Sequence, residues 1–240
     1  MRSEALITST RTKLTLLVGT TKGTFLICGG NDRSRWAVLG PYCDGWPINH
    51  VVGDPETGTL WAGGGGEWHG AGIWCSEDGG TNWKVTRLTK GKMDDWAAND
   101  AHFAKMIGWT GEPLPFTDTF TQIWSLGYAH GTLYAGTKPA SLLASENGGK
   151  DWERIRALTD HPSAGSWNPG GAGLVLHTIV SDPGNPKKSG LESRRPASSR
   201  PRMAERLGSA GTVSRTQKRA VITTTPPRRA MVTLVTASTT

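Results

Sequence analysis

Short apolar segments, each followed by a glycine-rich or polar turn, recur along most of the chain. Three segments share one order of residue types: a strand with glycine at or next to its end, an apolar strand, a polar turn and a tryptophan. They begin at Leu17, Leu60 and Leu133 and end at Trp36, Trp83 and Trp152. Apolar runs of this length between turn residues are typical of β-strands. The pattern therefore predicts repeated antiparallel sheets rather than helices.

The strand that opens each segment has the most regular sequence. Residues 60–63 read Leu-Trp-Ala-Gly and residues 133–136 read Leu-Tyr-Ala-Gly, while residues 17–20 read Leu-Val-Gly-Thr. A further apolar run precedes the second and third segments, at 48–52 and 122–127. Each of these units therefore contains four candidate strands, which is the composition of one blade of a β-propeller.

The turns before the last two tryptophans have identical spacing. One contains Ser76, Asp78, Gly80 and Trp83, and the other contains Ser145, Asn147, Gly149 and Trp152. A short acid or amide side chain can accept hydrogen bonds from nearby backbone N–H groups, and glycine permits a positive φ. The tryptophan can bury a large ring against neighbouring structure. We expect these eight residues to be structural.

These two turns, each preceded by a Leu-aromatic-Ala-Gly strand, resemble the Asp-box of BNR-repeat proteins, a group of sialidase-like and WD40/YVTN-BNR-like repeat proteins. The resemblance covers about residues 14–188. It implies an all-β fold, namely an incomplete β-propeller of four-stranded blades with Asp-box turns. The first segment departs from the motif, because Asn31 and Asp32 precede Trp36 without the complete spacing.

The segment at about 89–121 interrupts the repeats. Its residues 94–106 predict a short amphipathic helix. Trp96, Phe103 and Trp109 either line a ligand cleft or partner surface, or pack as a lid on the edge of the blade. We favour the lid. The run of four glycines at 63–66 lacks the residues of a phosphate-binding loop and predicts a flexible connection between strands.

The net charge of +7 is unevenly distributed. Residues 189–240 contain ten Lys or Arg and two Glu, a net charge of +8, whereas residues 1–188 have a net charge of −1. The same C-terminal stretch contains no Trp, Tyr, Phe, His or Cys. We therefore divide the chain into propeller blades at 14–188, with an insertion at about 89–121, and a basic, disordered tail at 189–240.

A shifted reading frame offers one origin for this tail. Codons compatible with residues 189–208, read in another frame, can encode Trp-Val-Gly-Ile-Ser-Ala-Pro-Gly-Val-Phe-Ala-Thr-Glu-Asp-Gly-Gly-Lys-Thr-Trp. That text contains the next expected strands and a third turn of the same type. We hypothesise that the tail is a frameshift product, and the alternative is a native basic tail. An unclosed set of blades leaves strand edges exposed and predicts poor solubility.

Catalysis finds little support in the residues. Sialidase chemistry requires an arginine cluster for a carboxylate, a tyrosine nucleophile with a glutamate partner, and an aspartic acid. Tyr42, Tyr128 and Tyr134 are the tyrosines of the chain, and the Arg-Ile-Pro segment typical of sialidases is absent. The residues do not establish an enzymatic activity, and we favour a protein without catalysis. The alternative is a glycosidase-like hydrolase of the exo-sialidase type.

Several polar residues of the expected loops are candidates for ligand binding. The carboxylates are Glu67, Asp100, Glu112 and Asp118, and the histidines are His50, His69 and His102. Two carboxylates near the propeller axis would serve a glycosidase, and histidines from successive blades could hold an anion or a metal. Ordinary solvated loop side chains are the alternative. No His or Cys spacing supports a metal site, so we expect no metal and no cofactor.

The leading function is binding of an unknown ligand or protein on the loop face of the propeller, without established catalysis. Three sparse cysteines do not form a disulfide framework, and the one apolar run near the N-terminus is too short to span a membrane. We therefore expect a cytoplasmic protein that binds neither membrane nor nucleic acid. A basic-tailed nucleic-acid binder is a third interpretation, which fails if the tail is a frameshift product.

Overall fold

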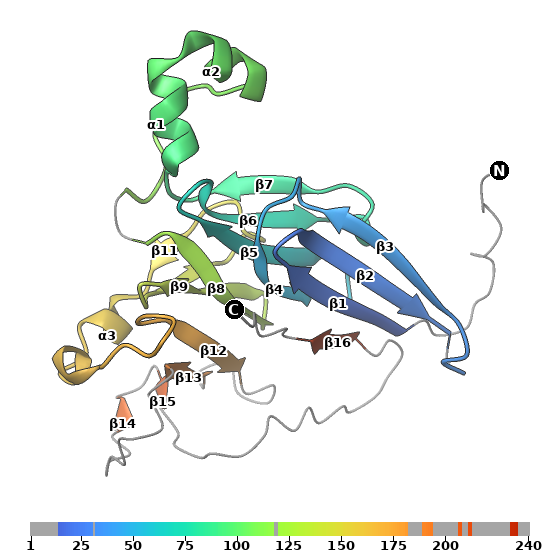
Figure 1. Ribbon diagram of the computed structural model, residues 1–240. Coiled ribbons are helices and arrows are strands. Elements are labelled where there is room, and N and C mark those ends of the chain that lie inside the picture. The colour runs from blue at the N-terminus through green and yellow to red at the C-terminus, as the bar shows by residue number, and fades with distance from the viewer. Residues whose placement is uncertain are drawn as a thin grey trace.

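The computed structural model describes residues 14–30, 32–117, 120–181, 189–193, 206–207, 211–212 and 231–234. These residues form mostly β structure, in three four-stranded sheets that follow one another along the chain (Figure 1). The first sheet contains β1 (Leu14–Thr20), β2 (Gly23–Gly29), β3 (Trp36–Tyr42) and β16 (Met231–Leu234). The second contains β4 (Ile48–Gly53), β5 (Leu60–Gly66), β6 (Gly70–Ser76) and β7 (Lys84–Arg87). The third contains β8 (Gln122–Ala129), β9 (Thr132–Lys138), β10 (Leu142–Ser145) and β11 (Glu153–Arg154).

The remaining elements are short. Two further strand pairs are β12 (Leu176–Ser181) with β13 (Ser189–Ser193), and β14 (Arg206–Leu207) with β15 (Gly211–Thr212). The helices are α1 (Lys92–Asn99), α2 (Ala101–Ile107), α3 (Arg156–Thr159) and the 3₁₀ turn η1 (Ala164–Ser166). Among the helices of the described ranges, none has both the length and the apolar character required to cross a bilayer.

The expected repeat of four-stranded sheets is confirmed in the second and third sheets. In both, four consecutive strands pair antiparallel in chain order. The first sheet has three consecutive strands, and its fourth position, beside β1, is filled by β16 in parallel orientation. The other residues after 193 lie largely outside the described residues, so the disordered tail and its origin in a frameshift stay predictions.

Successive sheets pack against one another through their first strands. β4 lies against β1, β8 lies against β4 and β5, and β12 lies against β8 and β9. Two apolar clusters fill the spaces between the sheets. Between the first two sheets lie Leu17, Leu26, Ile48, Leu60 and Trp74, and between the second and third lie Trp61, Ile73, Ile123, Leu126 and Leu133. Neighbouring blades of a β-propeller pack in this way.

The glycine of the repeated strand explains how close the sheets approach. A β-carbon on Gly19 would lie 2.7 Å from the carbonyl oxygen of Ile48, and one on Gly63 would lie 2.6 Å from Cγ2 of Ile123. A β-carbon on Gly136 would lie 2.4 Å from Oγ of Ser125 and 2.7 Å from the carbonyl oxygen of Leu176. At each junction the missing side chain therefore makes room for the first strand of the next sheet.

The expectation of a flexible connection at residues 63–66 is wrong. The four glycines form the second half of β5 and pair with β4 and β6. A β-carbon on Gly64 would lie 1.9 Å from the carbonyl oxygen of Pro47, and one on Gly65 would lie 1.9 Å from that of Gly70. Close backbone packing excludes side chains here, so glycine serves a strand rather than a loop.

The turns between β6 and β7 and between β10 and β11 have one hydrogen-bond pattern. Oγ of Ser76 accepts from the backbone N–H of Gly80 at 2.8 Å and donates to Oδ1 of Asp78 at 2.8 Å. The carboxylate of Asp78 also accepts backbone N–H groups three and four residues further on. Hydrogen bonds from the backbone and side chain of Asn82, then from Ser76, lower the pKa of Asp78 to about 2.

The second turn repeats these contacts with an amide. Oγ of Ser145 accepts from the backbone N–H of Gly149 at 2.8 Å and donates to Oδ1 of Asn147 at 3.0 Å. In both turns the indole N–H donates to the carbonyl of the second glycine, from Trp83 to Gly80 and from Trp152 to Gly149, at 3.0 Å. A carboxylate and an amide oxygen therefore fill the same position, because the turn uses each as an acceptor.

The insertion also differs from its prediction. The single helix expected at 94–106 is two helices, α1 and α2, separated at Asp100. The carboxylate of Asp100 accepts the backbone N–H groups of His102 and Phe103 at 2.9 Å. The first backbone N–H groups of a helix have no partner within the helix, and an aspartate just before them supplies an acceptor. Asp100 therefore favours the start of a second helix over the continuation of the first.

Candidate ligand-binding site

The two ends of the sheets differ. One end, which we name the loop face, contains the turns 67–69 and 139–141 and the long connections 88–121 and 155–175. These segments share an end because strand direction alternates and the first strands pack side by side. The other end contains short turns, including those of Ser76 and Ser145. Helices α1 and α2 stand clear of the sheets at the loop face (Figure 1).

The α1–α2 hairpin is fixed to the second sheet by the buried carboxylate of Asp94. Both terminal guanidinium nitrogens of Arg87 donate to it, and the backbone N–H of Gly91 donates at 2.8 Å. The indole N–H of Trp109 adds a third donor group at 3.1 Å. Burial opposes ionisation of Asp94, but the hydrogen bonds from Arg87 and Gly91 outweigh it and lower its pKa.

Two tryptophans of the loop face are exposed to solvent. Trp68 is 44% exposed and Trp96 is 48% exposed, and their ring centroids lie 5.9 Å apart. Trp96 also stacks on Phe103 with a centroid distance of 4.0 Å. Phe103 is buried against Trp96 and the indole of Trp109 donates to Asp94, so both pack within the hairpin, whereas the lid interpretation expected them on the edge of the blade. Trp96 instead forms an aromatic surface with Trp68.

His50 lies on β4 at the junction with the third sheet. Its Nδ1 accepts the backbone N–H of Leu126 at 2.7 Å, so the neutral ring has its proton on Nε2. Burial lowers the pKa of His50 to about 4, against the raising effect of that hydrogen bond, and the nearby His177 lowers it further. The side chain therefore joins two sheets as a neutral acceptor.

Glu67 and His69 share the turn between β5 and β6. Glu67 is exposed and pairs with Nζ of Lys92 at 2.6 Å, which lowers the pKa of its carboxyl. The ring of His69 stacks on Trp46 with a centroid distance of 4.6 Å. Burial and the charge of Arg87 lower the pKa of His69. The two candidates lie at one end of the second sheet, where each has its own contact.

The other sequence candidates are dispersed. Asp100 caps α2, while His102 and Glu112 are exposed on α2 and in the connection that follows. Asp118 lies outside the described residues. Within the ranges that the structure describes, no group of three or more His, Cys, Asp or Glu side chains is arranged to hold a metal ion.

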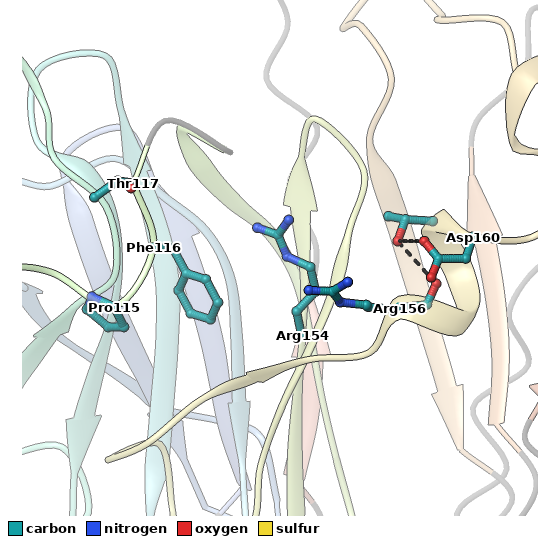
Figure 2. Close-up of a pocket in the computed structure, with 7 residues that line it drawn as sticks. Pro115, Phe116, Thr117, Arg154, Arg156 and Asp160 are labelled. Atoms are coloured by element: carbon teal, nitrogen blue, oxygen red, sulfur yellow. Dashed lines mark hydrogen bonds between the residues drawn. The ribbon is translucent and has the colours of Figure 1, made fainter.

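A hollow between the two long connections was not predicted from the sequence. Its volume is about 540 Å³, and it is lined by Pro115, Phe116, Thr117, Arg154, Arg156, Thr159 and Asp160. In the view of Figure 2, both guanidinium groups lie between Phe116 and Asp160. Alternation along residues 154–156, with charged positions flanking an apolar one, was the available signal.

The first strands carry a second feature that the sequence analysis missed. Each has a register shift at one residue, which is Asn49 in β4, Trp124 in β8 and His177 in β12. Nδ2 of Asn49 donates to the carbonyl of Ile123 at 2.8 Å, and Nζ of Lys138 lies 5.6 Å from the ring centroid of Trp124. Bulges re-aim side chains, so aligning the three strands would have identified these positions.

Comparisons with known proteins give structural matches alone. No family model matches the chain, and no curated protein matches it. Solved structures with similarity to this chain include the following two. "YCF48 bound to D1 peptide" has 13% sequence identity and a TM-score of 0.36 over 72% of this chain and 49% of that chain. "YCF48 from Cyanidioschyzon merolae" has 14% identity and a TM-score of 0.32 over 80% of this chain and 59% of that chain. The chain thus spans about half to three fifths of the length of these proteins.

Proposed function

We propose that this chain is a binding protein without catalysis, built as an incomplete Asp-box (BNR-type) β-propeller, and that its loop face holds a ligand or protein partner. The repeated turns at Ser76 and Ser145 support the Asp-box assignment, because each uses serine, an acid or amide acceptor, glycine and tryptophan in the same roles. The packing of first strands against the preceding sheet supports the propeller assignment.

The difference between the two ends of the sheets carries the functional proposal. Short hydrogen-bonded turns close one end, whereas the loop face has two long connections, the exposed Trp68 and Trp96, and the hollow lined by Arg154 and Arg156. Exposed aromatic residues and arginine are enriched at interfaces between proteins. Long loops on a rigid scaffold commonly carry binding residues.

The contacts of the candidate acids favour binding over hydrolysis. A glycosidase needs one carboxyl group that donates a proton and a second carboxylate that acts as base or nucleophile. Glu67 is paired with Lys92, and Asp100 is engaged by the start of α2. The two carboxyl groups therefore have different partners, at separate places in the fold.

The experiment uses the full chain as an immobilised bait, with two variants. A partner of the loop face is retained by the unmodified chain and by Trp36→Ala, and is lost with Trp96→Ala. Trp36 is a matched control, because it is 41% exposed on β3, beside a turn at the other end of the sheets. The captured partner is then titrated against all three chains.

Two results would contradict the proposal. If a partner binds all three chains equally, its binding does not depend on Trp96 and the loop face is not its binding surface. Turnover of an aryl glycoside that is lost on Glu67→Gln would replace binding by hydrolysis.

We further propose that residues from about 189 onward are a frameshift product, and that the protein is cytoplasmic. The composition changes abruptly at that point, where the repeat pattern calls for a Trp- and Gly-containing strand. Sequencing of the gene around codon 188 tests the frameshift. A single-base correction should restore a reading frame that encodes the repeat sequence. Stop codons in the restored frame would leave the basic tail as a native segment.

A further inference from the structure

The hollow on the loop face combines two arginines that have no ion pair among the described residues with an apolar wall. Its volume of about 540 Å³ lies within the range of small-molecule sites. The guanidinium of Arg154 lies 5.6 Å from the ring centroid of Phe116 and 5.9 Å from that of Phe120. These rings, which lie 5.4 Å apart, hold the planar group by cation–π contact.

The local sequence explains why two arginines meet at one place. Arg154 ends β11 and Arg156 begins α3, while Ile155 between them has an extended backbone. Side chains on either side of an extended residue point to the same side. Ile155 packs against the apolar cluster of the third sheet, and its backbone N–H donates to the carbonyl of Leu142 at 2.8 Å. Arg154 and Arg156 consequently both line the hollow.

The hydrogen-bonding capacity of these arginines is not used within the described chain. Neither Arg154 nor Arg156 forms an ion pair with a described residue. The Nε of Arg154 is buried and has no hydrogen-bond partner among the described residues. A buried donor without a partner is costly, so the guanidinium of Arg154 is not fully satisfied where it lies. Its terminal nitrogens can donate to an oxyanion in the hollow.

We infer that the hollow binds the carboxylate of a small ligand with a flat apolar body, such as an aromatic carboxylate. The planar fork of a guanidinium matches a carboxylate edge to edge. Phe116 and Pro115 supply an apolar wall for the body of the ligand. This assignment rests on the proposed binding function of the loop face, and it names the ligand class for one part of that face.

Asp160 determines the orientation in which the ligand binds. It lines the hollow on the side opposite Phe116 in the view of Figure 2, and its carboxylate accepts from Oγ1 of Thr159 at 3.4 Å. Its negative charge repels a second carboxylate, so the anionic end of the ligand lies towards the arginines. Removing this charge therefore strengthens the binding of an anion.

The test is a titration of the full chain with benzoate, with benzamide as the uncharged ligand of the same shape. Benzoate should bind at least about tenfold more tightly than benzamide, since only the anion completes the hydrogen bonds of Arg154. Arg154→Gln should weaken benzoate binding by about tenfold, and Asp160→Asn should strengthen it by a few fold. Arg35→Gln, at an exposed arginine in the turn before β3, should leave the affinity unchanged.

Three results would overturn the inference: equal binding of benzoate and benzamide, unchanged affinity in Arg154→Gln, or tighter binding of inorganic phosphate than of benzoate. If Arg154→Gln does not fold, Arg154→Lys keeps the charge but loses the fork, and should still weaken benzoate binding. Capture of a partner that depends on Trp96 is measured separately. Loss of benzoate binding with intact capture rejects this inference alone, whereas loss of both rejects the proposed function as well.

Discussion

The two turn serines, Ser76 and Ser145, each make the same pair of hydrogen bonds. Each hydroxyl accepts a glycine N–H at 2.8 Å and donates to the acid or amide two residues on. Both side chains are buried, at 1% and 2% exposure, so solvent does not replace a lost partner. The hydrogen bonds of the turn, and not ligand binding, therefore require serine at these two positions.

Replacement of either serine should destabilise the fold. Ser76→Ala and Ser145→Ala should each lower the free energy of unfolding by about 1–3 kcal/mol, because a buried glycine N–H is left unsatisfied. Urea denaturation measures the change. Ser34→Ala is the control, since Ser34 makes exposed contacts with Asp32 in the first segment, and should change stability by less than about 0.5 kcal/mol. Equal effects at all three positions would contradict the role of the turns.

His50 makes stability depend on pH. Its pKa is about 4 in the folded protein against 6.5 for an ordinary histidine, because burial disfavours the charged ring. Below pH 6.5 the unfolded chain therefore binds a proton that the folded chain does not bind until about pH 4. The stabilisation is complete above pH 6.5 and is lost as pH falls towards 4, by up to about 3 kcal/mol.

The measurement is the free energy of unfolding at pH 7 and at pH 5. The unmodified chain should lose stability between these values, and His50→Asn should show a weaker dependence, because an amide oxygen accepts from Leu126 without titrating. His69 also has a lowered pKa and adds dependence of the same sign, which remains in the variant. Identical slopes in both chains would show that His50 is not the titrating group.

At the scale of elements, the junction between sheets is the repeated unit of the fold. The glycine of the second strand, Gly63 or Gly136, lies against the first strand of the next sheet. Each junction also contains one hydrogen bond made by a side chain of the first strand. The ring of His50 on β4 accepts the backbone N–H of Leu126 on β8, and Oγ of Ser125 on β8 donates to the carbonyl of Leu176 on β12 at 2.7 Å. Each junction therefore combines close backbone packing with one polar contact between sheets.

Alanine at the junction glycines should be unfavourable. Gly63→Ala places a β-carbon 2.6 Å from Ile123 of the next sheet, and Gly136→Ala places one 2.7 Å from the carbonyl oxygen of Leu176 on β12. Each should cost about 1–3 kcal/mol of stability through overpacking. Thermal or urea unfolding measures this cost. Gly165→Ala is the control, because no atom lies within 4 Å of a β-carbon there. A control that costs as much as the junction variants would reject close packing as the cause.

The repeated turns and strands could be predicted from the sequence because their partners are close in the chain. Serine, acid and glycine lie within a few residues, so their spacing reveals the turn. The hollow could not be predicted in this way, since Phe116 lies in the connection before β8 and Arg154 lies on β11, and only the packing of the sheet brings them together. The glycine run 63–66 was misjudged because glycine usually marks loops, whereas here neighbouring backbone dictates it.

At the scale of the whole molecule, the array of sheets lacks a regular start and finish. β1 takes its neighbour from residues 231–234 in parallel, although the corresponding pairs β4–β5 and β8–β9 are antiparallel. At the other end, β12 lies against the third sheet as the first strand of a further unit. Repeat proteins gain stability from each added interface, so the proposal of an incomplete array predicts that further sheets on β12 would stabilise the protein.

Urea unfolding of a frame-restored chain tests this account most directly. The slope of unfolding free energy against denaturant grows with the surface exposed on unfolding. If the restored text after codon 188 forms further sheets on β12, the restored chain should have a larger slope and a higher midpoint than residues 1–240. An unchanged slope and midpoint would contradict the claim that the visible chain is part of a larger ring of repeated sheets.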